Sequence, residues 1–410
     1  MSLEPTVVDL FAGAGGMSLG FRRAGFRIVA AIEIDKWACQ TYRANIGNEV
    51  TEANITEMKD DSVASLTKGK VDVVVGGPPC QGFSISVRGG RNHRDPKDPR
   101  NTLFTEFVRF ISLLKPRVLV MENVRGLLTS KTEAGESVIK IIEDKLSDCG
   151  YRVKTSMLNA AEFGVPQERH RIFIIGTHEG KPDSLVPSPT HTGLFQDLGH
   201  WSTGRTKLLP FVSLWEAISD LPQISAGQGR EKWEYPTPAQ NAYQQEMREG
   251  STGVFNHEAM KHHARIVRRF KLIKPGQSLS DVPVDDKTAQ RRRGSDQLAG
   301  KAYDQNNRRV RPDNASPTIT ASFYANFVHP YLDRNLTARE AARLQSFPDV
   351  FIFKGKKTVP SFKLLAREGR REDMHLCQYA QIGNAVPPIL ARAIADRVRQ
   401  SLVPRIAEVC

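Results

Sequence analysis

The first 178 residues alternate between short apolar runs and longer segments with helical spacing. The runs that predict strands cover residues 6–10, 28–33, 71–77, 117–122, 151–158 and 171–176. Apolar positions recur with helical spacing between these runs, for example at residues 35–45, 101–114 and 136–149. Strands that alternate with helices form parallel sheets, because each parallel crossover needs a long connection. The pattern therefore predicts a doubly wound, mostly parallel α/β sheet with helices on both faces.

The pattern changes from about residue 177 to residue 330. Proline, glycine and polar residues become more frequent, and basic blocks appear at residues 261–271, 291–293 and 308–311. We interpret this stretch as a second, smaller domain that is rich in loops and basic side chains. Helical spacing returns at residues 388–402 and, before that, at residues 337–345, where Thr337 and Glu340 are spaced as a capping box.

Composition limits the class of protein. The chain has 410 residues, which is enough for two or three domains. Hydrophobic residues make up 40% of the chain and charged residues 25%, as in soluble globular proteins. The sequence contains no apolar stretch near the roughly 20 residues of a membrane helix, and its N-terminus has no signal segment. We therefore expect a cytoplasmic protein that has no membrane partner.

The cysteine spacing indicates the state of the thiols, and the net charge indicates the kind of partner. The cysteines at 39, 80, 149, 377 and 410 are widely spaced and form no CxxC pair, so we expect free thiols and no metal site. The formal net charge of +13 favours polyanionic partners. Charge alone indicates nucleic acid only weakly, since many basic proteins bind none.

A glycine-rich turn follows the first predicted strand. Gly13, Gly15 and Gly16 stand between that strand and the next helical segment, where a ligand can approach the backbone at a helix N-terminus. The dinucleotide fingerprint requires a further glycine where this chain has Ser18, so the turn is a poor match to an NAD-binding loop.

An acidic residue closes the second predicted strand. Glu33 lies twenty residues after Gly13, where a carboxylate accepts hydrogen bonds from ribose hydroxyls, and Ile34 is placed to pack on an adenine face. The combination indicates a nucleoside cofactor and leaves NAD(P) and S-adenosylmethionine both open. The alternative is a tight turn followed by a solvated acid.

The tetrapeptide Pro78-Pro79-Cys80-Gln81 closes the third predicted strand. Two prolines fix the chain before the cysteine, and open α/β sheets place their sites at the carboxyl ends of strands. A lone cysteine is more often a small buried hydrophobe, so the interpretation of Cys80 depends on its surroundings.

Six segments together resemble, in order, the motif set of the DNA cytosine-C5 methyltransferase family. They cover residues 9–21, 76–84, 121–124, 167–176, 339–349 and 381–388, and they omit only the basic middle of the chain. The resemblance implies a Rossmann-like, S-adenosylmethionine-dependent catalytic domain. Residues 1–180 would form its first part, and residues 331–410 would return to complete it. Residues 181–330 would form a target-recognition domain.

The resemblance also assigns chemistry. Cytosine C5 is a poor nucleophile until a thiolate adds at C6, and Cys80 matches the family's nucleophile. Glu122 matches the family's carboxyl at N3, a role that requires a pKa raised by burial. Arg169 and Arg171 match the arginines that orient the thiol and the base. From the residues alone, Glu122 could equally be a structural carboxylate and the arginines could lie on the surface.

The resemblance implies S-adenosylmethionine as the cofactor. Asn54 stands where the family often has an aspartate that holds the adenine amino group, so we expect binding with altered strength. The residues that match the family's cofactor pocket are Phe11, Gly13, Gly15, Gly16, Glu33, Ile34, Asn54, Ile55, Pro78, Asn384 and Val386.

The implied macromolecular substrate is double-stranded DNA. Chemistry on a stacked cytosine requires the base to be flipped out of the duplex. We expect a basic, glycine-rich lid at residues 81–100 and a segment at residues 318–323 to approach the DNA. The candidate DNA contacts are Ser84, Ser86, Arg88, Arg100, Thr318 and Thr320.

Three functions follow from these observations. We expect first a monomeric, sequence-specific DNA cytosine-C5 methyltransferase of bacterial or phage origin, either partnered with a separately acting restriction endonuclease or solitary. The second is the related tRNA cytosine-C5 methyltransferase, which the large basic middle disfavours. The third is a non-catalytic DNA-binding protein on the same scaffold.

Overall fold

The computed structural model describes residues 4–67, 69–79, 103–132, 134–193, 208–282 and 307–402. The chain divides into two compact units. The first unit comprises Met1–Phe163, Arg169–His191 and Val386–Cys410, and the second comprises Gly164–Glu168 and Thr192–Ala385. No helix within the described ranges is both long enough and apolar enough to cross a membrane.

A twisted sheet organises the first unit. Within the described residues it has seven strands in the order β3-β2-β1-β4-β5-β7-β6. The strands β1 to β5 pair in parallel, whereas β7 runs antiparallel to both β5 and β6. The strands are β1 (Thr6–Leu10), β2 (Arg27–Glu33), β3 (Val50–Glu52), β4 (Val73–Gly76), β5 (Val118–Val124), β6 (Arg152–Asn159) and β7 (His170–Thr177). The predicted doubly wound, mostly parallel α/β fold is confirmed.

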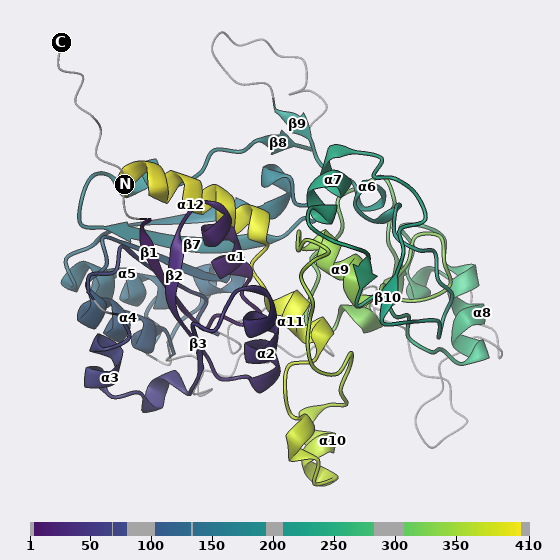
Figure 1. Ribbon diagram of the computed structural model, residues 1–410, viewed down its shortest axis with the longest axis horizontal. Coiled ribbons are helices and arrows are strands. Elements are labelled where there is room, and N and C mark those ends of the chain that lie inside the picture. The colour runs from purple at the N-terminus through teal and green to yellow at the C-terminus, as the bar shows by residue number, and fades with distance from the viewer. Residues whose placement is uncertain are drawn as a thin grey trace. The chain divides into compact units, whose positions relative to one another are not determined.

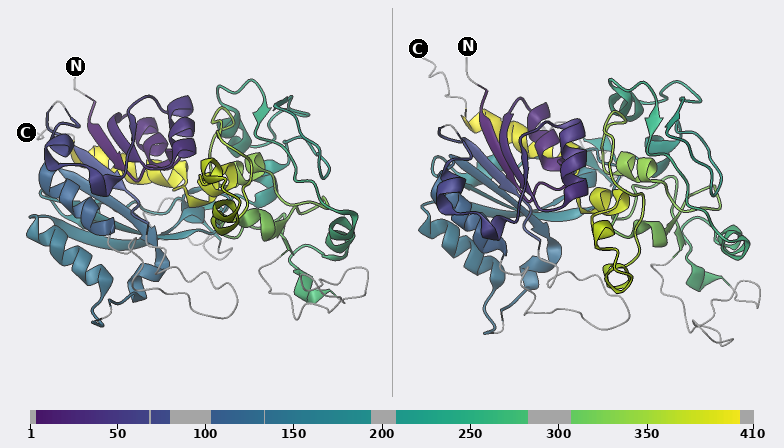
Figure 2. Two further views of the ribbon diagram at one scale, coloured as in Figure 1. Left: turned by 90° about the horizontal axis from the view of Figure 1, so that it is seen from below. Right: turned by 60° about the horizontal axis from the view of Figure 1, so that its bottom comes forward.

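Helices cover both faces of this sheet, as Figures 1 and 2 show. One face carries α1 (Gly16–Arg23), α2 (Lys36–Asn45) and α12 (Pro388–Leu402). The other carries α3 (Asp60–Ala64), α4 (Leu103–Leu114) and α5 (Val138–Asp148). The last helix therefore comes from the far end of the chain and packs against α1. Gly20 permits this approach, because a Cβ there would lie 2.4 Å from that of Ala391.

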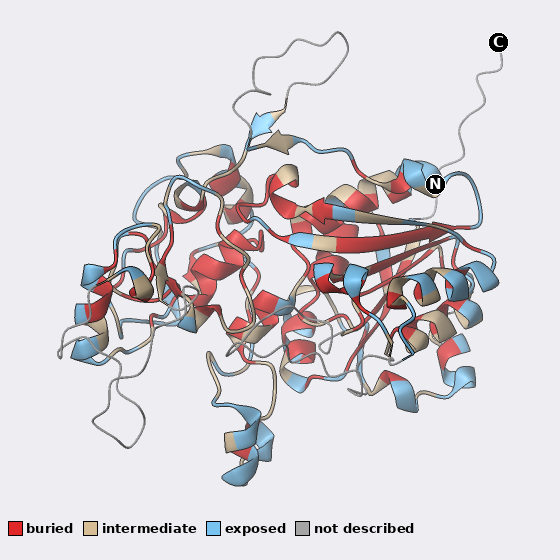
Figure 3. Cartoon of the chain, turned by 180° about the vertical axis from the view of Figure 1, so that it is seen from behind, coloured by how far each residue is buried: buried red, intermediate tan, exposed pale blue. Residues whose placement is uncertain are grey.

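The core sits between the sheet and the helices, and Figure 3 shows the strands mostly as buried. Alternate side chains of a strand face opposite sides of a sheet. In β1, Val8 and Leu10 join a buried cluster with Phe107 and Phe110 of α4. Burying each such side chain stabilises the fold by about 1.5–3 kcal/mol. Asp9 faces the other way, toward α1, where its carboxylate accepts a hydrogen bond from Ser18.

The six strands predicted from the sequence are all present, and their ends differ from the predicted ones by at most two residues. The edge strand β3 was not among them. Three residues, Val50–Glu52, are too few to show an alternating pattern, and the strand is recognisable only through its pairing with β2.

The second unit consists of short elements joined by long loops. Its helices are α6 (Leu214–Ile218), α7 (Ala242–Arg248), α8 (Ala264–Leu272), α9 (Ala338–Leu344), α10 (Phe362–Arg367) and α11 (Gln378–Asn384). The remaining strands are two residues long: β8 (His191–Thr192), β9 (Leu209–Pro210), β10 (Lys232–Trp233), β11 (Val254–Phe255), β12 (Arg308–Arg309) and β13 (Phe327–Val328).

Buried ion pairs hold the second unit together. Arg334 makes two hydrogen bonds with the carboxylate of Glu340, at 2.8 and 2.7 Å, and donates from Nε to the carbonyl of Ile224. Glu340 also completes the predicted capping box with Thr337 at the start of α9. Removal of one partner of such a buried, doubly hydrogen-bonded pair leaves the other charge uncompensated and costs about 3–5 kcal/mol.

A second arginine of α9 makes a similar cluster. Arg343 donates to both carboxylate oxygens of Asp349 at 2.6 Å, to Asp220 at 3.1 and 3.2 Å, and to the carbonyl of Ala217 at 2.8 Å. All three charged side chains are fully buried. The cluster joins segments that are more than a hundred residues apart in the sequence.

The boundaries of the two units differ from those predicted at residues 180 and 330. Residues 331–385 belong to the second unit, and the first unit resumes only at Val386. The physical reason lies in the two buried arginines, because Arg334 and Arg343 join this segment to residues 217–224. A hydrophobic pattern cannot reveal an attachment that is made through charged side chains.

Candidate active site

A carboxylate and a guanidinium meet at the junction of β5 and β7. The antiparallel register sets Arg171 opposite Val124 and Phe173 opposite Glu122. The side chain of Arg171 reaches back so that its Nε lies 2.9 Å from Oε1 of Glu122, and both side chains are largely buried. The sequence predicted these residues for one site, and the structure brings them together.

A second arginine acts on the same carboxyl group. Arg169 precedes β7 and is buried, and its backbone is fixed by hydrogen bonds with Asn159 and Ala160. Burial raises the pKa of Glu122, while the positive charges of Arg171 and Arg169 oppose that rise. The raised pKa agrees with the expectation from the sequence. A carboxyl group in this environment is suited to gain or lose a proton during a reaction.

The turn after β4 lies beside Glu122. A Cβ on Gly77 would come within 3.1 Å of Oε2 of Glu122, so glycine leaves room for the carboxylate. Asn123 is buried and donates from Nδ2 to the carbonyl oxygen of Pro78 at 3.1 Å. This hydrogen bond fixes the chain two residues before Cys80, which lies outside the described residues. Sequence reasoning assigned no role to Asn123, although its position at the carboxyl end of a strand, next to Glu122, was a usable signal.

The glycine-rich loop occupies the carboxyl end of β1. Three of its residues have left-handed backbone conformations, Phe11 (φ 57°), Gly13 (φ 55°) and Gly15 (φ 94°). A Cβ on Gly13 would meet open space, so its backbone is accessible to a ligand. A Cβ on Gly15 would lie 2.9 Å from the ring of Tyr42, so only glycine fits there.

Glu33 holds this loop from the neighbouring strand. Its Oε2 accepts a hydrogen bond from the backbone N–H of Gly13 at 2.7 Å, and its Oε1 accepts one from Asp35 at 2.8 Å. Burial raises the pKa of Glu33. Each carboxylate oxygen has a further lone pair for a ligand hydroxyl. The next residue, Ile34, is 65% exposed, an unusual position for a large apolar side chain.

Asn54 uses its side chain locally. Its Oδ1 accepts hydrogen bonds from the backbone and hydroxyl of Thr56, and its Nδ2 donates to Glu57. This arrangement caps the short 3-10 helix Ile55–Glu57, in which Ile55 is buried. An aspartate would accept the same two bonds, which explains why the fold tolerates asparagine at this position.

The other predicted residues are divided between the units. Val386 and Pro78 are buried in the first unit, whereas Asn384 is exposed at the end of α11 in the second. Thr318 donates its hydroxyl to the carbonyl of Glu168 at 2.7 Å, and Thr320 lies two residues further along the same segment. The predicted lid contacts Ser84, Ser86, Arg88 and Arg100 lie outside the described residues.

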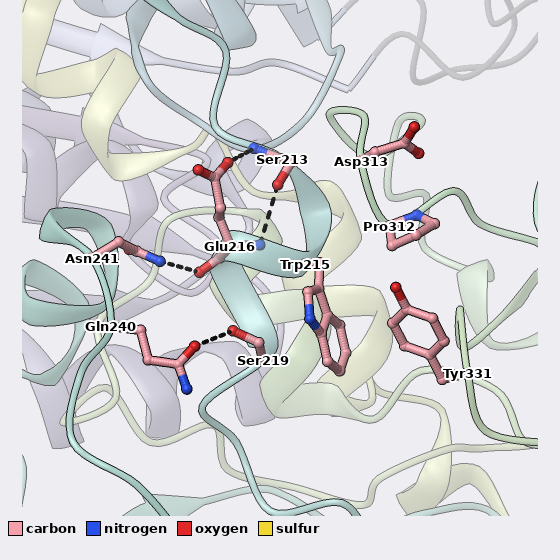
Figure 4. Close-up of a pocket in the computed structure, with 9 residues that line it drawn as sticks. All are labelled: Ser213, Trp215, Glu216, Ser219, Gln240, Asn241, Pro312, Asp313 and Tyr331. Carbon is pink, nitrogen blue, oxygen red and sulfur yellow. Dashed lines mark hydrogen bonds between the residues drawn. The ribbon is translucent and has the colours of Figure 1, made fainter.

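A separate pocket of about 400 Å³ lies in the second unit (Figure 4). The rings of Trp215 and Tyr331 meet edge to face on one side of it, with centroids 4.6 Å apart. Glu216 and Asp313 contribute carboxylates, and the described lining includes no lysine or arginine. The pocket is therefore unsuited to a phosphate backbone, and it contains none of the residues predicted for the site.

Fold and site together define a class of protein. Open α/β sheets bind nucleoside ligands at the carboxyl ends of their parallel strands. The glycine loop, Glu33 and the paired Glu122 and Arg171 all lie at those ends. The first unit is therefore an α/β enzyme domain of the nucleoside-cofactor type.

Comparison with known proteins identifies the family. The sequence profile of C-5 cytosine-specific DNA methylases matches residues 5–400. The Type II methyltransferase M.DdeI of Desulfomicrobium norvegicum is 45% identical over 395 residues, covering 96% of this chain and 88% of that protein. The Type II methyltransferase M1.HphI of Haemophilus parahaemolyticus is 36% identical over 395 residues, covering 96% and 86%. The chain thus belongs to the C-5 cytosine-specific DNA methylase family.

A solved structure supports the fold. A protein described as a DNA modification methyltransferase encoded within an E. coli prophage superimposes with a TM-score of 0.69 and 24% identity, covering 97% of this chain and 99% of that one. The family resemblance and the fold class inferred from the sequence are both confirmed. Of the three functions considered, family membership supports the DNA cytosine-5 methyltransferase over the tRNA enzyme and the non-catalytic protein.

Proposed function

We propose that this enzyme transfers a methyl group from S-adenosylmethionine to C5 of a flipped-out cytosine in a specific double-stranded DNA sequence. The observation that carries the proposal is the pair of Glu122 and Arg171, 2.9 Å apart beside the turn that leads to Cys80. The similarity to Type II methyltransferases supports a role in a bacterial restriction–modification system, in the cytoplasm. A separately acting endonuclease would then be the biological partner, unless the enzyme is solitary.

Cys80 begins the reaction. Its thiolate adds to C6 of the cytosine, the π electrons of the C5–C6 bond form a C4–C5 double bond, and those of the C4–N3 bond move onto N3, which the Glu122 carboxyl group protonates. C5 then accepts the methyl group that the cofactor supplies as an electrophile. Loss of the C5 proton then expels the Cys80 thiolate and restores the C5–C6 double bond, while N3 returns its proton to Glu122. Buried Arg169 and Arg171 would hold Glu122 and the base in place.

The loop of the first unit fits the cofactor. Gly13 presents an open backbone, Glu33 presents carboxylate oxygens for ribose hydroxyls, and exposed Ile34 offers an apolar face for adenine. We assign the remaining contacts to Phe11, Gly15, Gly16, Asn54, Ile55, Pro78, Asn384 and Val386.

The DNA contacts are assigned to both units. Ser84, Ser86, Arg88 and Arg100 would close over the flipped base, and Thr318 and Thr320 would contact the strand. The basic side chains of the second unit would neutralise phosphates, which makes binding weaken as salt concentration rises.

Bisulfite sequencing of DNA from cells that express the chain tests the proposal. We expect protected cytosines in one short shared context, none with Cys80→Ala, and an unchanged pattern with the matched thiol variant Cys149→Ala. Complete conversion in every sample, with the protein folded, would contradict the proposal.

A further inference from the structure

A buried carboxylate that the proposed reaction does not use lies directly before the cofactor loop. Asp9 is the fourth residue of β1, between β2 and β4, and it is only 1% exposed. A charge in the interior of a sheet is costly unless it is compensated by hydrogen bonds. Its partners therefore indicate what the residue does.

Asp9 begins a buried chain of hydrogen bonds that connects three elements. The hydroxyl of Ser18 on α1 lies 2.6 Å from Oδ2 of Asp9, and it lies 2.8 Å from the hydroxyl of Tyr42 on α2. All three side chains are buried. Ser18 stands where the dinucleotide fingerprint would have a glycine, and its hydroxyl links Asp9 to Tyr42.

The same chain supports the glycine loop from beneath. Asp9 precedes the loop at residues 11–16, and Ser18 follows it in the first turn of α1, whose N-cap residue Gly15 has no side chain to accept a hydrogen bond. The ring of Tyr42 lies directly against Gly15. Asp9, Ser18 and Tyr42 thus fix the loop at its entry, its exit and its middle. The negative charge of Asp9 also lies near a helix N-terminus, which favours anions.

The direction of the chain depends on one proton. When Asp9 is ionised, Ser18 donates to its carboxylate and Tyr42 donates to Ser18. When Asp9 is protonated, it can donate to Ser18, which frees the Ser18 hydroxyl to donate to Tyr42. Burial raises the pKa of Asp9 to about 7, against the lowering effect of the hydrogen bonds from Ser18. The change of donor therefore accompanies the titration of Asp9.

Other charges set the environment of this chain. Among the described residues, the groups that act on Asp9 are Ser18 on α1 and the Glu33 carboxylate at the end of β2. Burial raises the pKa of Tyr42 on α2, and the charges of Asp9, Glu49 and Arg22 also act on it. The hydroxyl of Tyr42 therefore stays protonated. Asp9 is accordingly the member of the chain that titrates near neutrality.

We propose that Asp9 is a positioning residue for the cofactor loop, and that its ionised form favours a cationic ligand over a neutral one. This inference rests on the proposed function, in which the loop binds S-adenosylmethionine, whose sulfonium is positive, and releases S-adenosylhomocysteine, whose sulfur is neutral. Ionised Asp9 would help the enzyme to prefer substrate over product.

Calorimetric titration with both ligands from about pH 5.5 to about pH 8.5 tests this idea, with the ratio of the two dissociation constants as the readout. The ratio cancels any general loss of binding. For the wild type we expect the preference for S-adenosylmethionine to rise severalfold as Asp9 ionises, because a buried negative charge attracts the sulfonium but not the neutral sulfur. Asp9→Asn should make the ratio nearly independent of pH.

Two further variants distinguish an effect of these hydrogen bonds on the ionisation of Asp9 from a merely structural role. Ser18→Ala removes the donor that stabilises ionised Asp9, so the midpoint of the pH profile should move to higher pH, and Tyr42→Phe should move it less in the same direction. Asp72→Asn is the matched control, because Asp72 accepts hydrogen bonds from Thr6 at the other end of β1. Its profile should match the wild type.

The outcomes are distinct. A wild-type pH profile in Asp9→Asn overturns the inference, as does an unmoved midpoint in Ser18→Ala, which decides the matter alone if Asp9→Asn does not fold. Failure of the wild type to bind either ligand at any pH would instead overturn the proposed function. Thermal unfolding of each variant establishes that it is folded.

Discussion

Nε of Arg171 lies 2.9 Å from Oε1 of Glu122, across the antiparallel ladder that joins β7 to β5. Within the described part of the sheet, β7 runs antiparallel to both of its neighbours and thus delivers a positive charge to the carboxyl end of the parallel strand β5. Removal of either partner would leave a largely buried charge without compensation, so the pair is held as a unit. Glu122 is kept in place while burial shifts its pKa upward.

Replacement of Glu122 by glutamine tests its role as a proton donor. Glutamine keeps the size of the side chain and an oxygen for Arg171, but it cannot supply the proton that N3 requires. We expect kcat for DNA methylation to fall by about 10²–10⁴-fold. The control Glu179→Gln alters an exposed carboxylate that pairs with Arg117, and it should retain full activity. A Glu122→Gln enzyme with wild-type kcat would exclude the acid role.

DNA that contains 5-fluorocytosine at the target position should trap the enzyme. Fluorine cannot leave C5 as a proton, so the covalent bond between Cys80 and C6 should persist after methyl transfer. A band of retarded mobility should appear in denaturing gels with the wild type and disappear with Cys80→Ala, which should still bind DNA and cofactor. An active enzyme that forms no such band would refute addition at C6.

Removal of the Glu33 carboxylate should weaken cofactor binding. Glu33→Ala deletes the acceptor for Gly13 and for the ribose, and we expect a loss of about 1–3 kcal/mol in binding free energy. Calorimetry with S-adenosylmethionine measures the loss. Glu52→Ala, an exposed acid on the neighbouring strand β3, serves as the control. Equal affinity in all three proteins would remove Glu33 from the pocket.

The hydrogen bond from Asn123 to Pro78 should matter for chemistry more than for binding. Asn123→Ala leaves the buried carbonyl of Pro78 without this donor, which costs about 1–3 kcal/mol and loosens the turn before Cys80. We expect slower formation of the 5-fluorocytosine adduct with an unchanged dissociation constant for the cofactor. A normal rate of adduct formation would show that the turn is held by other contacts.

The buried cluster around Arg343 should dominate the stability of the second unit. Arg343→Ala leaves Asp349 and Asp220 buried without their shared partner, and we expect about 3–5 kcal/mol of destabilisation in urea unfolding. Glu368→Ala, which breaks an exposed pair with Arg370, should leave the free energy of unfolding unchanged. Similar losses in both variants would contradict the importance of burial.

This cluster also predicts a direction of pH dependence. Burial acts to raise the pKa of Asp349, but the hydrogen bonds and positive charge of Arg343 outweigh it and leave the pKa below its usual 3.8. The contribution of Asp349 to stability is therefore present above pH 3.8 and is lost as the pH falls through its folded-state pKa. Arg343→Ala should flatten the acid limb of a stability profile measured by urea unfolding between pH 5 and pH 3.

The sequence alone determined the sheet, its helices and the family. Apolar runs that alternate with amphipathic segments permit few arrangements other than a doubly wound sheet, and motifs such as Pro78-Pro79-Cys80-Gln81 are short and local. Strand β3 was not predicted from the sequence, because three residues are too few to show an alternating pattern. Its place in the sheet depends on pairing with β2.

Only the tertiary structure decided which distant side chains meet. The pairing of Glu122 with Arg171, the anchoring of Pro78 by Asn123 and the chain from Asp9 through Ser18 to Tyr42 all depend on register and helix placement. The same holds for residues 331–385, which buried arginines attach to the second unit. Hydrophobic periodicity records which face of an element is buried, whereas hydrogen bonds and ion pairs depend on angstrom-scale positions that no linear pattern contains.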